Sequence, residues 1–157
     1  MMKNIKFIFW GFVTALGALA MEMALAVFFP GEMLAIFDRI TFLIFLFVAI
    51  EELFKLAVIF RSVSAAAFFR PSFLIGSGFA LTEIFLAYSK NAATAGPDLF
   101  LLLAGVGILH IVTSIICGFS AFYYKKNDSL ALPSIAFFLA LILHLVYNIA
   151  IINLINN

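Results

Sequence analysis

Hydrophobic positions fill five long runs of the chain, and short polar segments separate them. Each run is long enough for one helix to cross a bilayer, which takes about 20 apolar residues. The pattern predicts an all-α fold: a polytopic transmembrane helical bundle that forms a single integral membrane domain over residues 1–157. The predicted spans cover residues 5–29, 40–60, 72–89, 99–123 and 130–154.

Composition supports a membrane protein. Apolar residues make up 66% of the chain and charged residues 11%, whereas soluble domains are about half apolar and a quarter charged. The excess apolar surface must face lipid, so we expect the bilayer itself to be a partner. The first run exceeds the about 7–15 apolar residues of a signal peptide, so we expect it to be retained. A net charge of +1 argues against a nucleic-acid partner.

Basic residues between the runs predict the orientation. A cytoplasmic N-terminus places six of them inside and only Arg39 and Lys90 outside, which the positive-inside rule favours. We therefore predict a multi-pass protein of the cell (cytoplasmic) membrane with its N-terminus in the cytoplasm. The six residues predicted to lie inside are Lys3, Lys6, Arg61, Arg70, Lys125 and Lys126.

Ionisable side chains occupy the middle of four predicted spans. At a rise of about 1.5 Å per residue, they lie roughly 16–21 Å from the start of each span, near the centre of a core about 30 Å thick. Polar groups at this depth usually mark a site or a pathway. They are Glu51, Glu52 and Lys55 in the second span, Glu83 in the third, His110 in the fourth, and His144 with Asn148 in the fifth.

The second span depends on its neighbours. Its three charged residues cost about 9 kcal/mol together, and its apolar residues return about 8 kcal/mol. Lys55 can pair with Glu51 or Glu52, which precede it by four and three residues. The two glutamates point about 100° apart around the helix. We expect one of them to face the site and the other to pair with Lys55 or the backbone.

Carboxylates and imidazoles in a partly dry site are suited to activating water. A glutamate can act as general base, a histidine can orient the water or stabilise an oxyanion, and the Asn148 amide can donate to that oxyanion. The same groups can instead hold a divalent metal such as zinc, with Glu51, His110 and His144 as ligands. Glu22, in the outer half of the first span, is expected to pair locally or to reach towards the membrane surface, and the alternative is that it lines the entry path to the site.

Two other functions fit the same residues. Chains of Glu and His also carry protons or ions across membranes. Alternatively, buried polar groups can satisfy one another in a non-catalytic binding or immunity protein.

Four short motifs occur in order along the last four spans: Glu51-Glu52-Leu53-Phe54-Lys55, Phe79 with Glu83, His110 with Gly118, and His144 with Asn148. In this order, the motifs resemble those of the PrsW-type intramembrane proteases. That family belongs to a superfamily with the CAAX prenyl endopeptidases and with bacteriocin-processing or immunity membrane proteins. The resemblance covers residues 50–150.

The resemblance implies an intramembrane endopeptidase that cleaves membrane-embedded or membrane-anchored protein substrates. Glu51 would activate the water and Glu52 would help to hold the site. Glu83 would replace the water-orienting histidine of the CAAX enzymes, and His110 would be the histidine of the third motif. His144 and Asn148 would bind the water and the oxyanion. Both metal-dependent and glutamate-dependent mechanisms have been described for such proteins. The short outer loops predict either a minimal enzyme or a homo-oligomer.

Overall fold

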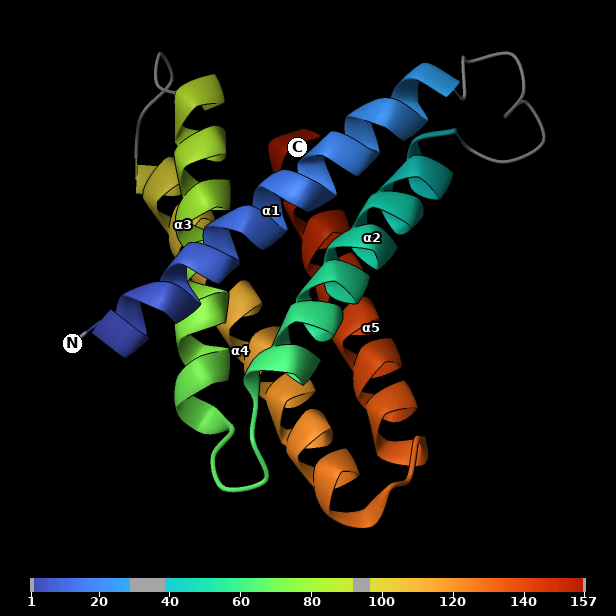
Figure 1. The fold of residues 1–157 in the computed structure, drawn as a ribbon. Helices are drawn as coiled ribbons and strands as arrows, with labels where there is room; N and C mark the ends of the chain where they lie inside the picture. The colour runs from blue at the N-terminus through green and yellow to red at the C-terminus, as the bar shows by residue number, and fades with distance from the viewer. Residues whose placement is uncertain (1, 29–38, 92–96, 157) are drawn as a thin grey trace.

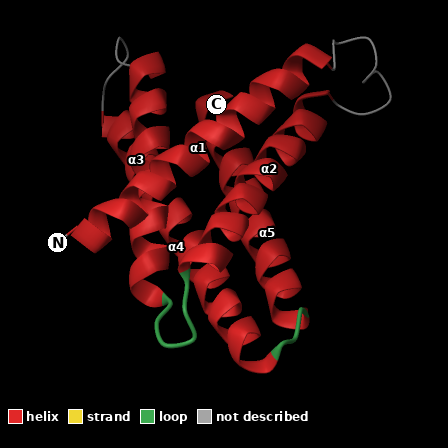
Figure 2. Cartoon of the chain, in the orientation of Figure 1, coloured by secondary structure: helices red, strands yellow, loops and turns green. Residues whose placement is uncertain are grey.

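The computed structural model describes residues 2–28, 39–91 and 97–156, and it leaves out a few side chains at the ends of these segments. The described residues form five helices and no strand (Figures 1 and 2). The all-α prediction is therefore confirmed. The helices are α1 (Met2–Phe28), α2 (Arg39–Ser62), α3 (Phe69–Asn91), α4 (Pro97–Asn127) and α5 (Ala131–Asn156).

Four of the helices, α1, α3, α4 and α5, are long and apolar enough to cross a membrane. The protein is thus an integral membrane protein. The remaining helix, α2, is also long and rich in apolar residues, but it carries three charged residues, Glu51, Glu52 and Lys55, in its middle, and these set it apart from the other four. It packs against α1, α4 and α5, which can supply the partners that its charged residues require.

Basic side chains gather at one end of the bundle. The loop between α2 and α3 lies at the same end as the turn between α4 and α5 (Figure 1), and Lys125 Nζ donates a hydrogen bond to the carbonyl of Val63 in that loop. Lys6 and Arg61 line one cavity of about 520 Å³. This grouping is what the positive-inside argument requires. The side of the membrane that this end faces stays a prediction, and the side chains of Lys3, Arg39 and Lys90 lie outside the described residues.

Glycines let α1 cross α3 at very short range. A Cβ placed on Gly11 would lie only 2.8 Å from the Cα of Gly78 and 2.8 Å from the nitrogen of Phe79. Only glycine permits backbones to approach this closely, and small residues have this role in many membrane helices. The crossing, in which α1 runs obliquely over α3 (Figure 1), holds Phe79 in the interior.

A tight turn joins α4 to α5. Asp128 has a φ of 50°, the left-handed conformation that ends many helices, and its backbone N–H donates to the carbonyl of Tyr124 at 2.8 Å. The chain reverses there, so α4 and α5 run antiparallel as neighbours (Figure 1). This hairpin brings His110 and His144 onto adjacent helices.

Candidate functional site

A fully buried ion pair lies in the middle of α2. Glu52 and Lys55 are both 0% exposed, and Lys55 Nζ lies 2.5 Å from Glu52 Oε1. The two residues are three positions apart and therefore share a face of the helix. The structure thus resolves the alternative left open by the sequence: Glu52 pairs with Lys55, and Glu51 is the glutamate that points elsewhere.

Lys55 also links α2 to α4. Its ammonium group donates to Thr113 Oγ1 at 3.1 Å and lies 3.1 Å from His110 Nδ1. A protonated lysine has three N–H donors, and Glu52, His110 and Thr113 provide one acceptor each. The ring of Phe79 lies beneath the ammonium, with its centroid 4.8 Å from Nζ. This cation therefore has a full set of partners inside the bundle.

The two histidines lie against each other in the interior. His110 is 2% exposed and His144 is 4% exposed. Their ring centroids are 5.1 Å apart, and the ring planes meet at 84°. His144 Nδ1 lies 2.8 Å from Glu52 Oε1, and Nε2 on the other side of the ring lies 3.7 Å from Glu51 Oε2. His144 therefore bridges the two glutamates of α2.

The hydrogen-bond partners decide where each imidazole carries its proton. Glu52 is paired with an ammonium and can only accept, so the 2.8 Å contact requires an N–H on Nδ1 of His144. The Nε2 of neutral His144 is then a bare acceptor. Lys55 can only donate, so His110 Nδ1 must accept and neutral His110 carries its proton on Nε2. The two histidines thus have opposite tautomers.

Glu51 contributes a buried carboxylate oxygen to this group. Its Oε2 has no hydrogen-bond partner among the described residues, although its side chain is only 14% exposed. Buried polar atoms without a protein partner usually meet water or a ligand. This oxygen, beside the bare nitrogen of His144, therefore offers a second acceptor next to the first, where a water molecule can bind.

The predicted site residues differ in how closely they converge. Direct contacts join Glu51, Glu52, Lys55, His110 and His144. Glu83 is half-buried on α3, which packs against α2.

Asn148 lies one turn after His144 and is half-buried. The described residues give it no hydrogen bond to the cluster. Phe79 belongs to the second motif without an expected role, and its ring centroid lies 4.7 Å from that of His110. Its place one turn before Glu83 was the available signal.

A metal ion fits only part of this donor set. One atom each of Glu51, His110 and His144 lie within 4.8 Å of one another, and His144 has the carboxylate partner that metal-binding histidines usually have behind them. His110 does not fit. Its Nδ1 faces the Lys55 ammonium, and binding a metal through Nε2 would put an N–H on Nδ1, where it would oppose another donor. The residues present therefore favour water over a metal.

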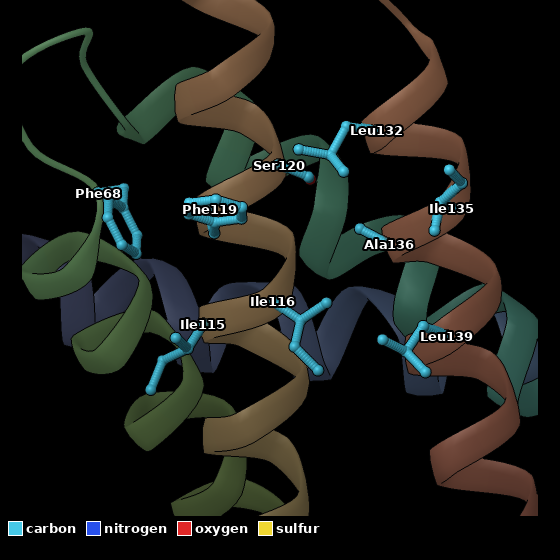
Figure 3. Close-up of a pocket in the computed structure, with 9 residues that line it drawn as sticks. All are labelled: Phe68, Ile115, Ile116, Phe119, Ser120, Leu132, Ile135, Ala136 and Leu139. Carbon is cyan, nitrogen blue, oxygen red and sulfur yellow. The ribbon is translucent and has the colours of Figure 1, made fainter.

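An apolar groove lies elsewhere between α4 and α5 (Figure 3). It has a volume of about 400 Å³, and its lining residues are Phe68, Ile115, Ile116, Phe119, Ser120, Leu132, Ile135, Ala136 and Leu139. None of the site residues lines it, so the acid and imidazole groups belong to a separate place in the bundle.

The comparisons with known proteins give no relative: no family model, no curated protein and no solved structure matches the chain. The resemblance to the PrsW-type proteases therefore stays a prediction from the four motifs.

Proposed function

We propose that the protein is an intramembrane peptidase of the cell membrane, which hydrolyses peptide bonds of membrane-anchored protein substrates with water activated by Glu51. One observation carries the proposal: the carboxylate oxygen Oε2 of Glu51 and the bare Nε2 of His144 lie 3.7 Å apart inside the bundle. Two adjacent acceptors can each take one hydrogen bond from the same water. The motif order of the PrsW-type proteases supports the same chemistry.

The reaction follows from the protons that the cluster holds. The water oxygen attacks the carbonyl carbon of the scissile bond while Glu51 takes one of its protons. His144 Nε2 accepts the other hydrogen bond and orients the oxygen. His110, which can only donate through Nε2, supplies a hydrogen bond to the developing oxyanion. The C–N bond then breaks, and Glu51 returns the proton to the leaving amine.

The substrate must unwind before it can react. A membrane helix keeps its peptide groups in its own hydrogen bonds, so an intact span hides the bond from Glu51. We expect cleavage near helix-breaking residues such as Gly or Pro. A substrate held within the bilayer also explains why so much of the chain is membrane helix.

The test uses the purified full chain in lipid vesicles with synthetic single-span peptides that carry Gly-Pro at their centre. Mass spectrometry in ¹⁸O-water should show two fragments, with one ¹⁸O atom in the new carboxyl terminus. Glu51→Gln should lower the rate at least about a hundredfold, since it removes the general base. Asp128→Asn is the matched control, because it also neutralises a carboxylate but lies in the turn after α4.

Two results would overturn the proposal. Cleavage that persists at the wild-type rate in a folded Glu51→Gln variant would remove Glu51 from the chemistry. An absence of cleavage across the peptide set, together with a proton flux through the vesicle wall that Glu51→Gln abolishes, would identify a relay instead.

A further inference from the structure

We propose that Lys55 is a positioning residue, which holds His110 as a permanent hydrogen-bond donor and thereby gives the two histidines different roles. The role in catalysis rests on the proposed peptidase function. The placement of the protons does not, because it follows from contacts within the bundle. Lys55 lies on α2 and reaches His110 on α4 at 3.1 Å.

The surroundings of His110 leave Lys55 as the group that fixes its proton. On α4 itself, Thr113 Oγ1 accepts from Lys55 and lies 3.4 Å from the carbonyl of His110, not from its ring. On α3, the neighbour is the apolar ring of Phe79. On α5, His144 meets His110 edge to face and gives its own Nδ1–H to Glu52.

The lysine is well placed for this role because it cannot turn away. It is 0% exposed, and Glu52 and Thr113 hold two of its three N–H groups. The third must meet His110 Nδ1. A proton on that nitrogen would leave two donors facing each other in a dry interior, which is costly. His110 is thereby prevented from acting as a base, which leaves Glu51 to take the proton and His144 to orient the water.

The same ion pair also fixes the proton of His144, but on Nδ1 instead of Nε2. Lys55 holds Glu52 as a carboxylate, and Glu52 Oε1 takes the Nδ1–H of His144 at 2.8 Å. One lysine therefore determines, directly or through Glu52, which nitrogen of each ring is bare. As a result, Nε2 of His110 is a hydrogen-bond donor and Nε2 of His144 is an acceptor.

The experiment reads the protons directly. The chain has two histidines in all. Solid-state NMR of the full protein, labelled with ¹⁵N-histidine in lipid vesicles, therefore observes four ring nitrogens. A His144→Asn variant assigns them. We expect wild-type spectra with bare Nδ1 and protonated Nε2 for His110, and with the reverse for His144.

The informative variant changes both members of the ion pair, Glu52→Gln with Lys55→Met, so that neither member is left behind as an uncompensated charge. The amide oxygen of Gln can still accept from His144, so His144 should keep its tautomer. His110 should acquire a protonated Nδ1 in at least about a tenth of the molecules. Lys126→Met is the matched control, since Lys126 also lies over a phenylalanine ring, 4.4 Å from the centroid of Phe122, but at the end of α4.

Each outcome decides between the alternatives. A protonated Nδ1 on His110 in the wild type, or an unchanged His110 in the folded double variant, would overturn the role of Lys55. If the peptide assay works, the double variant should lower kcat at least about tenfold with KM within about twofold. If no peptide is cleaved but the spectra change as expected, the peptidase proposal fails and the assignment of Lys55 stands.

Discussion

The buried pair of Glu52 and Lys55 provides the sharpest prediction for stability. Both side chains are 0% exposed and 2.5 Å apart. Lys55→Met would leave a carboxylate uncompensated in the interior, and Glu52→Gln would leave an ammonium. Removing one member of a buried pair costs about 3–5 kcal/mol. Each single substitution should therefore lower the free energy of unfolding by about that amount.

The double substitution should lower the free energy of unfolding by less than either single substitution does. It leaves neither member of the pair as a lone charge, and the main loss is the hydrogen bonding of Lys55 to His110 and Thr113. Leaving such buried polar groups unsatisfied costs about 1–3 kcal/mol. The two substitutions should therefore be strongly non-additive.

The assay is reversible unfolding in mixed micelles with increasing dodecyl sulfate, followed by far-ultraviolet circular dichroism. Lys126→Met, outside the cluster, should change the free energy of unfolding by less than about 0.5 kcal/mol. A double variant destabilised by the sum of the single effects, about 6–10 kcal/mol, would refute the reasoning. It would mean that the two side chains contribute independently.

Three further predictions test the packing and the metal assignment. Gly78→Ala should destabilise the protein by about 1–3 kcal/mol in the same assay, because a Cβ there would meet the backbone of α1. Gly107→Ala is the control and should change stability little, because its Cβ would meet only the end of an isoleucine side chain at 3.3 Å. Tyr147→Phe should cost about 0.5–1.5 kcal/mol, since it removes a 2.9 Å hydrogen bond to a backbone carbonyl of α4; no loss would show that this bond contributes nothing. Chelator treatment should leave the rate of peptide cleavage within about twofold of the untreated rate, and elemental analysis should find far less than one metal per chain. Activity that is lost with chelator and returns with zinc would contradict the tautomer assignment of His110.

Much of the fold could be predicted because the bilayer constrains it strongly. A membrane helix needs a long apolar run, and the five helices begin and end within a few residues of the predicted spans. The layer of ionisable groups was predictable for a related reason: rise per residue fixes depth once a span is known. The convergence of His110 on α4 with His144 on α5 agrees with that estimate.

Sequence could not predict the rotation of each helix about its axis. The spacing allowed Lys55 to pair with either Glu51 or Glu52, and the choice depends on how α2 faces α4 and α5. Contacts such as that of Lys55 with His110 depend on close packing between helices, as at the crossing of Gly11 and Gly78. Such crossings are set by shape, which a list of residues does not specify.

The proposed site depends on the separation of His144 Nε2 from the carboxylate of Glu51. Solid-state NMR on the protein in lipid vesicles, with ¹⁵N-histidine and ¹³C-carboxyl glutamate, measures it through the dipolar coupling of the two nuclei. The structure predicts a coupling that corresponds to an Nε2–Oε2 separation of 3.7 Å and that disappears in Glu51→Gln. Spectra in which neither imidazole couples to the Glu51 carboxyl would contradict the site.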